Sequence, residues 1–171
     1  MERDALCRLA WSSVAVLGTL LVAHCGGGHE EHTVDEAGCE HIVEPFDAVQ
    51  ETATVDIATA PGQTHEHVHE RINLVPFEGG MGGFVKFPAP APAEYTMFFD
   101  SFITLEVFDE RQTPIPPKFM PAPSQLCPDN IPVQYSYDLQ NALYILKLGG
   151  MGYTQNFVGV VIEDTIRLKG H

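Results

Sequence analysis

The sequence predicts an all-β protein, a single antiparallel β-sandwich of about eight strands with a jelly-roll-like arrangement. From about residue 52 onward, short apolar runs are separated by Gly, Pro, Asn and Asp, and no run has the length and period of an amphipathic helix. Apolar and polar side chains alternate along runs such as 94–99 and 103–107, as in strands with one buried face. A chain of 171 residues in which apolar residues make up 44% is long enough for one such domain.

The chain begins with features of an exported protein. Residues 9–23 form an apolar run of 15 residues, the length of a signal-peptide core and shorter than the ~20 residues that a spanning helix needs. We therefore expect residues 1–24 to be a signal peptide, although a buried core helix is the alternative. The run ends in Val22-Ala23-His24-Cys25, which resembles the lipobox of bacterial lipoproteins. The resemblance implies a lipid on Cys25 and an anchor in the outer or cytoplasmic membrane, facing the periplasm or the cell surface. An ordinary signal peptide cut near Gly26 remains open.

The charge and the cysteines narrow the function classes further. With 9 Lys and Arg against 23 Asp and Glu, the net charge is −14, which excludes binding of nucleic acid through a basic surface. Of four cysteines, Cys7 leaves with the leader and Cys25 would carry lipid. Cys39 and Cys127 then remain, and in an oxidising compartment we expect them to form a disulfide. The alternative is that Cys39 is a thiolate metal ligand beside His41.

The mature chain divides into a tether and a domain. Residues 25–38 are polar and rich in Gly, His and Glu, which predicts a flexible tether, and residues 39–171 form the β-sandwich domain. Seven of the thirteen prolines lie from Pro114 to Pro132, which predicts an extended surface loop. The similar segments GGMGG at 79–83 and GGMGY at 149–153 predict tight turns before strands. Strands are expected at 52–59, 69–77, 83–87, 94–100, 103–109, 132–139, 142–148 and 156–163.

The order of these strand signals resembles a known domain family. The runs GGFVKFPAPAPAEYTMFFDS, FITLEVFDE, YSYDLQNALYILKLGG and NFVGVVIED look like the β-sandwich of pre-peptidase C-terminal domains, over about residues 69–163. The resemblance implies a hairpin across 137–148, in which Ala142 stands where the family usually has Gly. It also implies a non-catalytic appendage of a secreted protein.

Histidine is the chemically unusual residue of this chain. Six of its eight histidines lie between residues 29 and 69, among glutamates: His29, His32, His41, His65, His67 and His69. On a strand, His65, His67 and His69 would share a face with neighbours ~6.6 Å apart, so two of them could share one ion at ~2.0–2.1 Å. We expect a site of His65 and His67 with His41 from another segment, and with His69 as substitute. A polar strand end without an ion is the alternative.

The chemistry of these ligands favours Zn, with Cu(II) or Ni(II) possible, because imidazole suits all three. Calcium is disfavoured, since no acidic calcium-binding loop is present. The string His65-Glu66-His67-Val68-His69 also matches H-E-x-x-H, the motif of zinc proteases, which requires a helix.

Other catalytic arrangements are missing from the sequence. The three serines beyond the leader, Ser101, Ser124 and Ser136, do not lie in G-x-S-x-G, so no hydrolase nucleophile is indicated. We therefore expect a non-catalytic, metal-binding envelope protein. The alternatives are a surface adhesion module that binds protein or glycan without metal, and a purely structural envelope protein. A glycan site would depend on tyrosines, because the only Trp lies in the leader. The candidates are Tyr135, Tyr137, Tyr144 and Tyr153.

Overall fold

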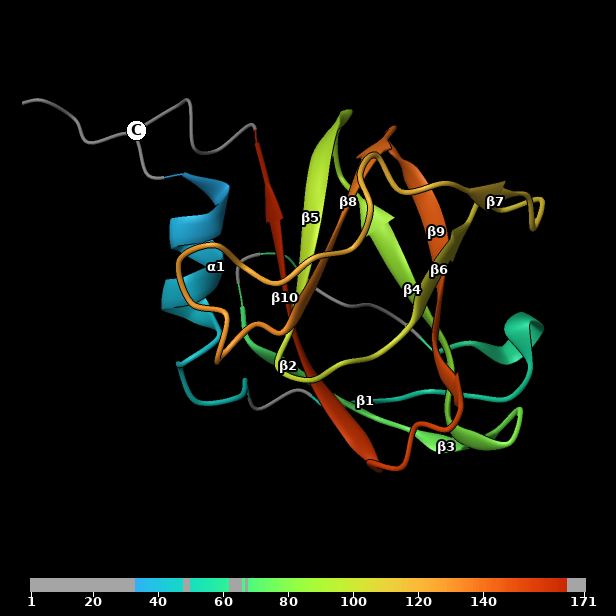
Figure 1. Cartoon of the computed structure of the whole chain (residues 1–171). Helices are drawn as coiled ribbons and strands as arrows, with labels where there is room; N and C mark the ends of the chain where they lie inside the picture. Colours follow the sequence, from blue (N-terminus) through green and yellow to red (C-terminus); the bar gives the residue numbers. More distant parts are fainter. Residues whose placement is uncertain (1–32, 48–49, 62–65, 67, 166–171) are drawn as a thin grey trace, which may run out of the picture.

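Two five-stranded β-sheets pack face to face in the computed structural model of the chain, which describes residues 33–47, 50–61, 66 and 68–165 (Figure 1). The first sheet has the strand order β1-β2-β10-β5-β8, and the second has the order β3-β4-β9-β6-β7. Neighbouring strands are antiparallel except β1 and β2, which are parallel. The predicted all-β sandwich is thus confirmed. The elements in chain order are α1 (Val34–His41), β1 (Gln50–Thr52), the short 3-10 helix η1 (Ile57–Thr59), β2 (Glu70–Asn73), β3 (Val75–Phe77), β4 (Gly80–Ala89), β5 (Ala93–Phe99), β6 (Leu105–Phe108), β7 (Pro114–Ile115), β8 (Val133–Leu139), β9 (Ala142–Met151) and β10 (Phe157–Asp164).

The main core lies between the sheets and is built from alternate side chains of each strand. In β5, Tyr95, Met97 and Phe99 are fully buried in this core, as the alternation predicts. Phe98 belongs instead to a second cluster on the outer face of the first sheet. Three more residues that were predicted to share one face are also buried in the main core: Ile103, Leu105 and Val107.

Helix α1 starts at a capping box and covers the outer face of the first sheet. The Thr33 hydroxyl accepts a hydrogen bond from the Glu36 N–H at 3.2 Å, and the Glu36 carboxylate accepts one from the Thr33 N–H at 2.6 Å. The structure thus places a helix over residues 34–38, which were predicted as part of a flexible tether. A helix of only eight residues shows too short a period to be recognised in the sequence. The rest of the tether, residues 25–32, lies outside the described residues.

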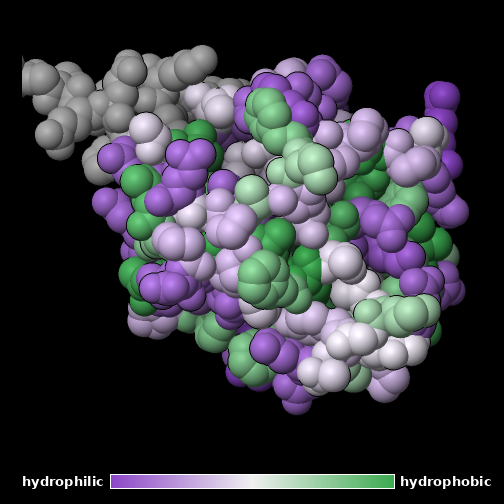
Figure 2. All heavy atoms as spheres, in the orientation of Figure 1, coloured by the Kyte–Doolittle hydropathy of each residue, from purple (hydrophilic) through white to green (hydrophobic). Residues whose placement is uncertain are grey.

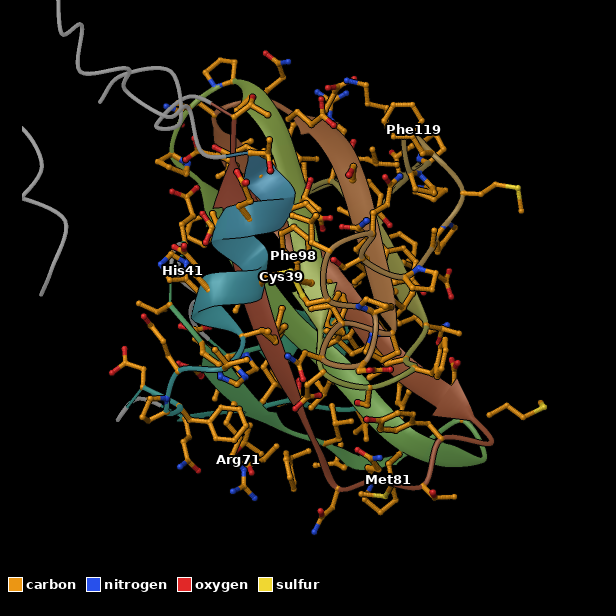
Figure 3. The ribbon with its side chains drawn as sticks, turned by 60° about the vertical axis from the view of Figure 1, so that its left-hand side comes forward. Cys39, His41, Arg71, Met81, Phe98 and Phe119 are labelled. Carbon is orange, nitrogen blue, oxygen red and sulfur yellow. A yellow bond between two sulfur atoms is a disulfide. The ribbon has the colours of Figure 1, made fainter. Side chains whose placement is uncertain are left out.

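The helix approaches the sheet closely because Gly38 has no side chain. A Cβ at this position would lie 2.6 Å from the ring of Phe98, which Figure 3 shows beside the helix. The buried residues of this second cluster are Ile42, Phe98, Ile131 and Val161. Since Ile131 lies in the proline-rich loop, the cluster joins the helix, the sheet and the loop.

The predicted disulfide between Cys39 and Cys127 is confirmed. The two Cα atoms are 6.0 Å apart, and the bond ties α1 to the loop between β7 and β8, which passes across the helix in Figure 1. Cys39 is therefore unavailable as a thiolate ligand, the alternative that the sequence had left open. Most of the proline-rich loop lacks strand structure, as predicted, but Pro114 and Ile115 form β7.

Two predicted strands differ from the structure. The strand expected at 52–59 ends at Thr52, because the Asp56 carboxylate accepts a hydrogen bond from the Ala58 N–H at 2.9 Å and caps η1. The strand expected at 69–77 is interrupted at Leu74, where the chain passes from β2 in the first sheet to β3 in the second. A corner of this kind leaves the run of apolar residues uninterrupted, so the sequence pattern does not reveal it.

The two glycine-rich segments were predicted as tight turns before strands, and this is confirmed only in part. Gly79 lies in the turn before β4 and Gly152 in a turn after β9, whereas the other glycines of both segments belong to paired strands. Gly80 and Gly82 of β4 lie opposite Met151 and Gly149 of β9. A Cβ on Gly82 would lie 2.3 Å from the carbonyl oxygen of Leu148. Glycine is needed here because the two backbones approach too closely for a side chain. Glycine is also common in tight turns, so the sequence alone does not distinguish the two roles.

The hairpin expected across 137–148 is also absent, because β8 belongs to the first sheet and β9 to the second. The chain crosses between the sheets at Gln140 and Asn141. Tyr144 closes this crossing, since its hydroxyl accepts a hydrogen bond from the Gln140 N–H at 2.8 Å. Tyr95 does the same at the crossing from β4 to β5, where its hydroxyl donates to the Ala91 carbonyl at 2.8 Å.

Candidate metal centre

Of the four predicted metal ligands, the structure describes His41 and His69. The other two, His65 and His67, lie outside the described residues, as does the predicted lipidation site Cys25.

His41 ends α1 and is paired with a buried carboxylate. Its Nδ1 lies 2.5 Å from Oε1 of Glu163 in β10, and the Glu163 side chain is almost fully buried. Figure 3 shows His41 at the C-terminal end of the helix, where the helix dipole favours positive charge. This pairing gives His41 a structural role in holding α1 against the first sheet.

His69 lies just before β2 in a very different environment. Its side chain is buried, with 7% of the residue exposed, and its ring contacts Phe46 with the ring centroids 4.2 Å apart. The Nδ1 atom lies 2.8 Å from the Glu44 carbonyl oxygen, which can only accept, so Nδ1 carries a proton. The Nε2 atom is buried and has no hydrogen-bond partner among the described residues. In the neutral ring, Nε2 therefore presents an unused lone pair.

A glycine of β10 lies directly beside this nitrogen. A Cβ on Gly159 would lie 2.6 Å from His69 Nε2 and 2.5 Å from Asp100 Oδ2, closer than real Cβ atoms come to other heavy atoms. The imidazole and the carboxylate thus converge above the backbone of this one residue. No hydrogen bond or ion pair joins Nε2 to Asp100, although both residues belong to the described part of the chain.

Asp100 is held in place by a chain of hydroxyl groups. The Ser101 hydroxyl donates to Asp100 Oδ1 at 3.1 Å, and the Tyr153 hydroxyl lies 2.9 Å from the Ser101 hydroxyl. Burial raises the pKa of Tyr153 above its usual value, the hydrogen bond with Ser101 opposes this, and the charge of Asp100 raises the pKa further. Tyr153 therefore stays protonated and can donate a hydrogen bond at neutral pH.

The sequence analysis missed Asp100. One signal was present, because Gly159 interrupts an otherwise apolar strand, and a glycine inside a strand often marks the close approach of another group. Which groups approach it is decided by the pairing of β10 with β5 and β2. That pairing brings together residues 69, 100 and 159, which are far apart in the sequence.

The structure does not bring His41 and His69 together. Their neighbours on β10, Glu163 and Gly159, are four residues apart on the same strand, which corresponds to roughly 13 Å. Among the described residues, no three side chains of His, Cys, Asp or Glu are grouped so that they could hold a metal ion. The described part of the candidate site is therefore the pair His69 and Asp100.

The described residues of the H-E-x-x-H protease motif do not form a helix. Glu66 and Val68 are not helical, and β2 begins directly after His69. The described part of H-E-x-x-H thus lacks the helix that would place two histidines and a glutamate on one face.

The tyrosines proposed for glycan stacking are mostly in the interior. Tyr135, Tyr137 and Tyr144 are buried in the main core, and only Tyr153 is half-exposed. Buried rings cannot stack on a sugar, so the prediction that these tyrosines bind a glycan is wrong for the three buried ones.

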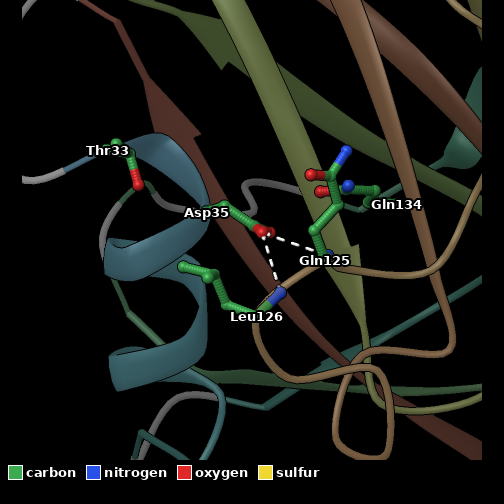
Figure 4. A pocket seen from close by; sticks show the side chains of 5 residues that line it. All are labelled: Thr33, Asp35, Gln125, Leu126 and Gln134. Atoms are coloured by element: carbon green, nitrogen blue, oxygen red, sulfur yellow. Dashed lines mark hydrogen bonds between the residues drawn. The ribbon is translucent and has the colours of Figure 1, made fainter.

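An open pocket of about 410 Å³ lies beside the start of α1 (Figure 4). Asp35 on the helix accepts hydrogen bonds from the backbone N–H groups of Gln125 at 3.1 Å and Leu126 at 3.2 Å. These bonds attach the proline-rich loop to the helix, so the carboxylate at this pocket stabilises the fold.

Comparison with known protein families and with curated proteins found no match to this chain. Within the described residues, the only α-helix is far too short to cross a lipid bilayer. A function therefore has to be inferred from the residues of the candidate site.

Proposed function

We propose that this chain is an exported, lipid-anchored β-sandwich protein that binds a divalent transition metal and catalyses no reaction. The apolar run at 9–23 and Cys25 support export and anchoring. The Cys39–Cys127 disulfide supports export as well, because disulfides persist in oxidising compartments and are rare in the cytosol.

The observation that carries the metal proposal is the buried, unused Nε2 of His69. Metal-binding histidines usually donate the second ring N–H to a carbonyl or carboxylate, which fixes the ring and leaves the other nitrogen free for the metal. His69 has this arrangement, with Nδ1 held by the Glu44 carbonyl at 2.8 Å. Its position in a segment with His65 and His67 adds further candidate ligands.

The proposal predicts that Zn, Cu(II) or Ni(II) raises the melting temperature of the full chain. A metal present at ~100 times its dissociation constant adds ~2.7 kcal/mol to the free energy of unfolding. For a domain of this size, that corresponds to a rise of roughly 5–10 °C. Calorimetry with and without metal measures the shift, and metal content after dialysis measures retention.

Histidine variants show which side chains cause the metal-induced rise in melting temperature. The His65→Ala/His67→Ala double variant and His69→Asn should each reduce the melting shift, whereas His171→Ala, outside the histidine-rich region, should not. If no metal shifts the melting temperature of the unmodified chain, the proposed function is wrong.

The competing proposal is a protein-binding surface module without metal. It is favoured by the proline-rich loop, where Phe119 is 62% exposed and Met120 is 89% exposed. The face seen in Figure 2 carries separate green areas among polar residues, without one continuous apolar surface. If none of the three metals changes the melting temperature, the protein-binding module is favoured.

A further inference from the structure

We infer that Asp100 is the carboxylate ligand of this metal site, so that His69 and Asp100 together hold a divalent transition metal above Gly159. The inference rests on the proposed function and deepens it, because it names a ligand that the sequence did not indicate.

Two candidate ligand atoms lie close together at Gly159. Asp100 Oδ2 and His69 Nε2 lie 2.5 Å and 2.6 Å from the same point, the position of an absent Cβ on Gly159. The two ligand atoms therefore lie no more than about 5 Å apart, beside the backbone of Gly159. Two ligands that bind one ion at ~2.1 Å lie no more than ~4.2 Å apart. A small shift of the half-exposed Asp100 carboxylate would close the remaining distance, whereas the buried His69 ring is fixed.

The electrostatics of these two groups also favour a cation. In the neutral ring, the Nε2 lone pair and the Asp100 carboxylate are both acceptors that face the same space, so they cannot hydrogen-bond to each other. A buried acceptor without a partner costs ~1–3 kcal/mol. A divalent cation between the two groups satisfies the lone pair and the negative charge at once.

Supporting contacts orient the imidazole and one oxygen of the carboxylate before any ion binds. The Glu44 carbonyl and the Phe46 ring fix the imidazole of His69, while the Ser101 hydroxyl donates to the far oxygen of Asp100. Such supporting hydrogen bonds orient ligands in established metal sites and affect affinity by ~10–100-fold.

The ligand set also limits the kind of metal. One imidazole nitrogen and one carboxylate oxygen suit Zn(II), Ni(II) and Cu(II), whereas Mg(II) and Ca(II) prefer oxygen ligands alone.

The test is zinc titration of the full chain by calorimetry, together with NMR of the histidine ring nitrogens. Zinc should shift the Nε2 resonance of His69, assigned by its loss in His69→Asn. Asp100→Asn keeps the size of the side chain and should weaken zinc binding about tenfold or more. Asp129→Asn removes an exposed carboxylate elsewhere and should change affinity by less than about twofold.

The possible failures are distinguishable. If the unmodified chain binds zinc, and Asp100→Asn binds it equally well with an unchanged amide spectrum, Asp100 is not a ligand although the proposed function stands. If metal-free His69 proves to be protonated on Nε2 and zinc leaves its resonance unmoved, the pair is an ion pair, and the inference is overturned. Absence of zinc binding by the unmodified chain would overturn both proposals.

Discussion

Tyr95 and Tyr137 lie directly opposite each other in the pairing of β5 with β8, and among the described residues only the Tyr95 hydroxyl has a hydrogen-bond partner. The Tyr95 hydroxyl donates to the Ala91 carbonyl at 2.8 Å, whereas the Tyr137 hydroxyl is buried without a partner among the described residues. Burial raises the pKa of Tyr95 to about 12 and that of Tyr137 further. Both phenols therefore remain neutral at physiological pH. They differ in that only the Tyr95 hydroxyl has a hydrogen-bond partner among the described residues.

This difference predicts opposite effects of the same substitution. Tyr137→Phe removes an unsatisfied hydroxyl and should raise the free energy of unfolding by about 1 kcal/mol, whereas Tyr95→Phe breaks a hydrogen bond and should lower it by about 1 kcal/mol. Urea denaturation measures both values. Equal effects in the two variants would mean that Tyr137 has a partner, such as an internal water molecule.

At the scale of elements, the close pairing of β4 with β9 depends on glycine. The register sets Gly82 opposite Gly149 and Met81 opposite Gly150, so glycine occurs on both strands of the pair. A Cβ on Gly149 would lie 2.3 Å from the Met81 carbonyl oxygen, and its φ of +69° disfavours other residues. This end of the second sheet therefore tolerates little variation.

We expect Gly82→Ala to lower the free energy of unfolding by about 1–3 kcal/mol, because the added methyl group overlaps the Leu148 carbonyl oxygen. Met151→Ala on the partner strand removes a side chain that is 92% exposed and should change stability by less than about 0.5 kcal/mol. Chemical denaturation of the two variants makes the comparison. Similar stability of both variants would show that the backbones can separate without loss.

At the scale of the whole molecule, the Cys39–Cys127 disulfide ties α1 to the proline-rich loop. The helix, the first sheet and the proline-rich loop meet at the cluster of Ile42, Phe98, Ile131 and Val161, beside the Cys39–Cys127 bond. The cysteines are 88 residues apart in sequence, so the bond closes most of the β-sandwich into one loop.

Removal of this bond should destabilise the whole domain. In the chain-entropy model, a closed loop of this length contributes about 4 kcal/mol, so Cys39→Ala/Cys127→Ala should unfold at a clearly lower denaturant concentration. Reduction of the unmodified chain by a thiol should have the same effect. An unchanged unfolding midpoint in both experiments would mean that the cluster alone fixes the loop.

Much of the fold could be predicted from sequence, since alternation places residues such as Tyr95 and Met97 in the core regardless of how strands pair. The crossing at Leu74 and the separation of β8 from β9 could not, because apolar residues on either side of a corner look like one strand or one hairpin. At the candidate site, the histidine-rich segment of the sequence pointed to His69. Asp100 could not be recognised as a ligand, because nothing in its neighbouring residues marks it as one.

By itself, the sequence indicated the sandwich class, the surplus of acidic charge and the pairing of Cys39 with Cys127, because these follow from periodicity and composition. Only the tertiary structure decided that His41 pairs with Glu163 while His69 faces Asp100 across Gly159. The physical reason is that sheet pairing brings the residues next to the ends of β2 and β5 beside β10, and the order of strands in a sheet is not contained in the period of any one of them.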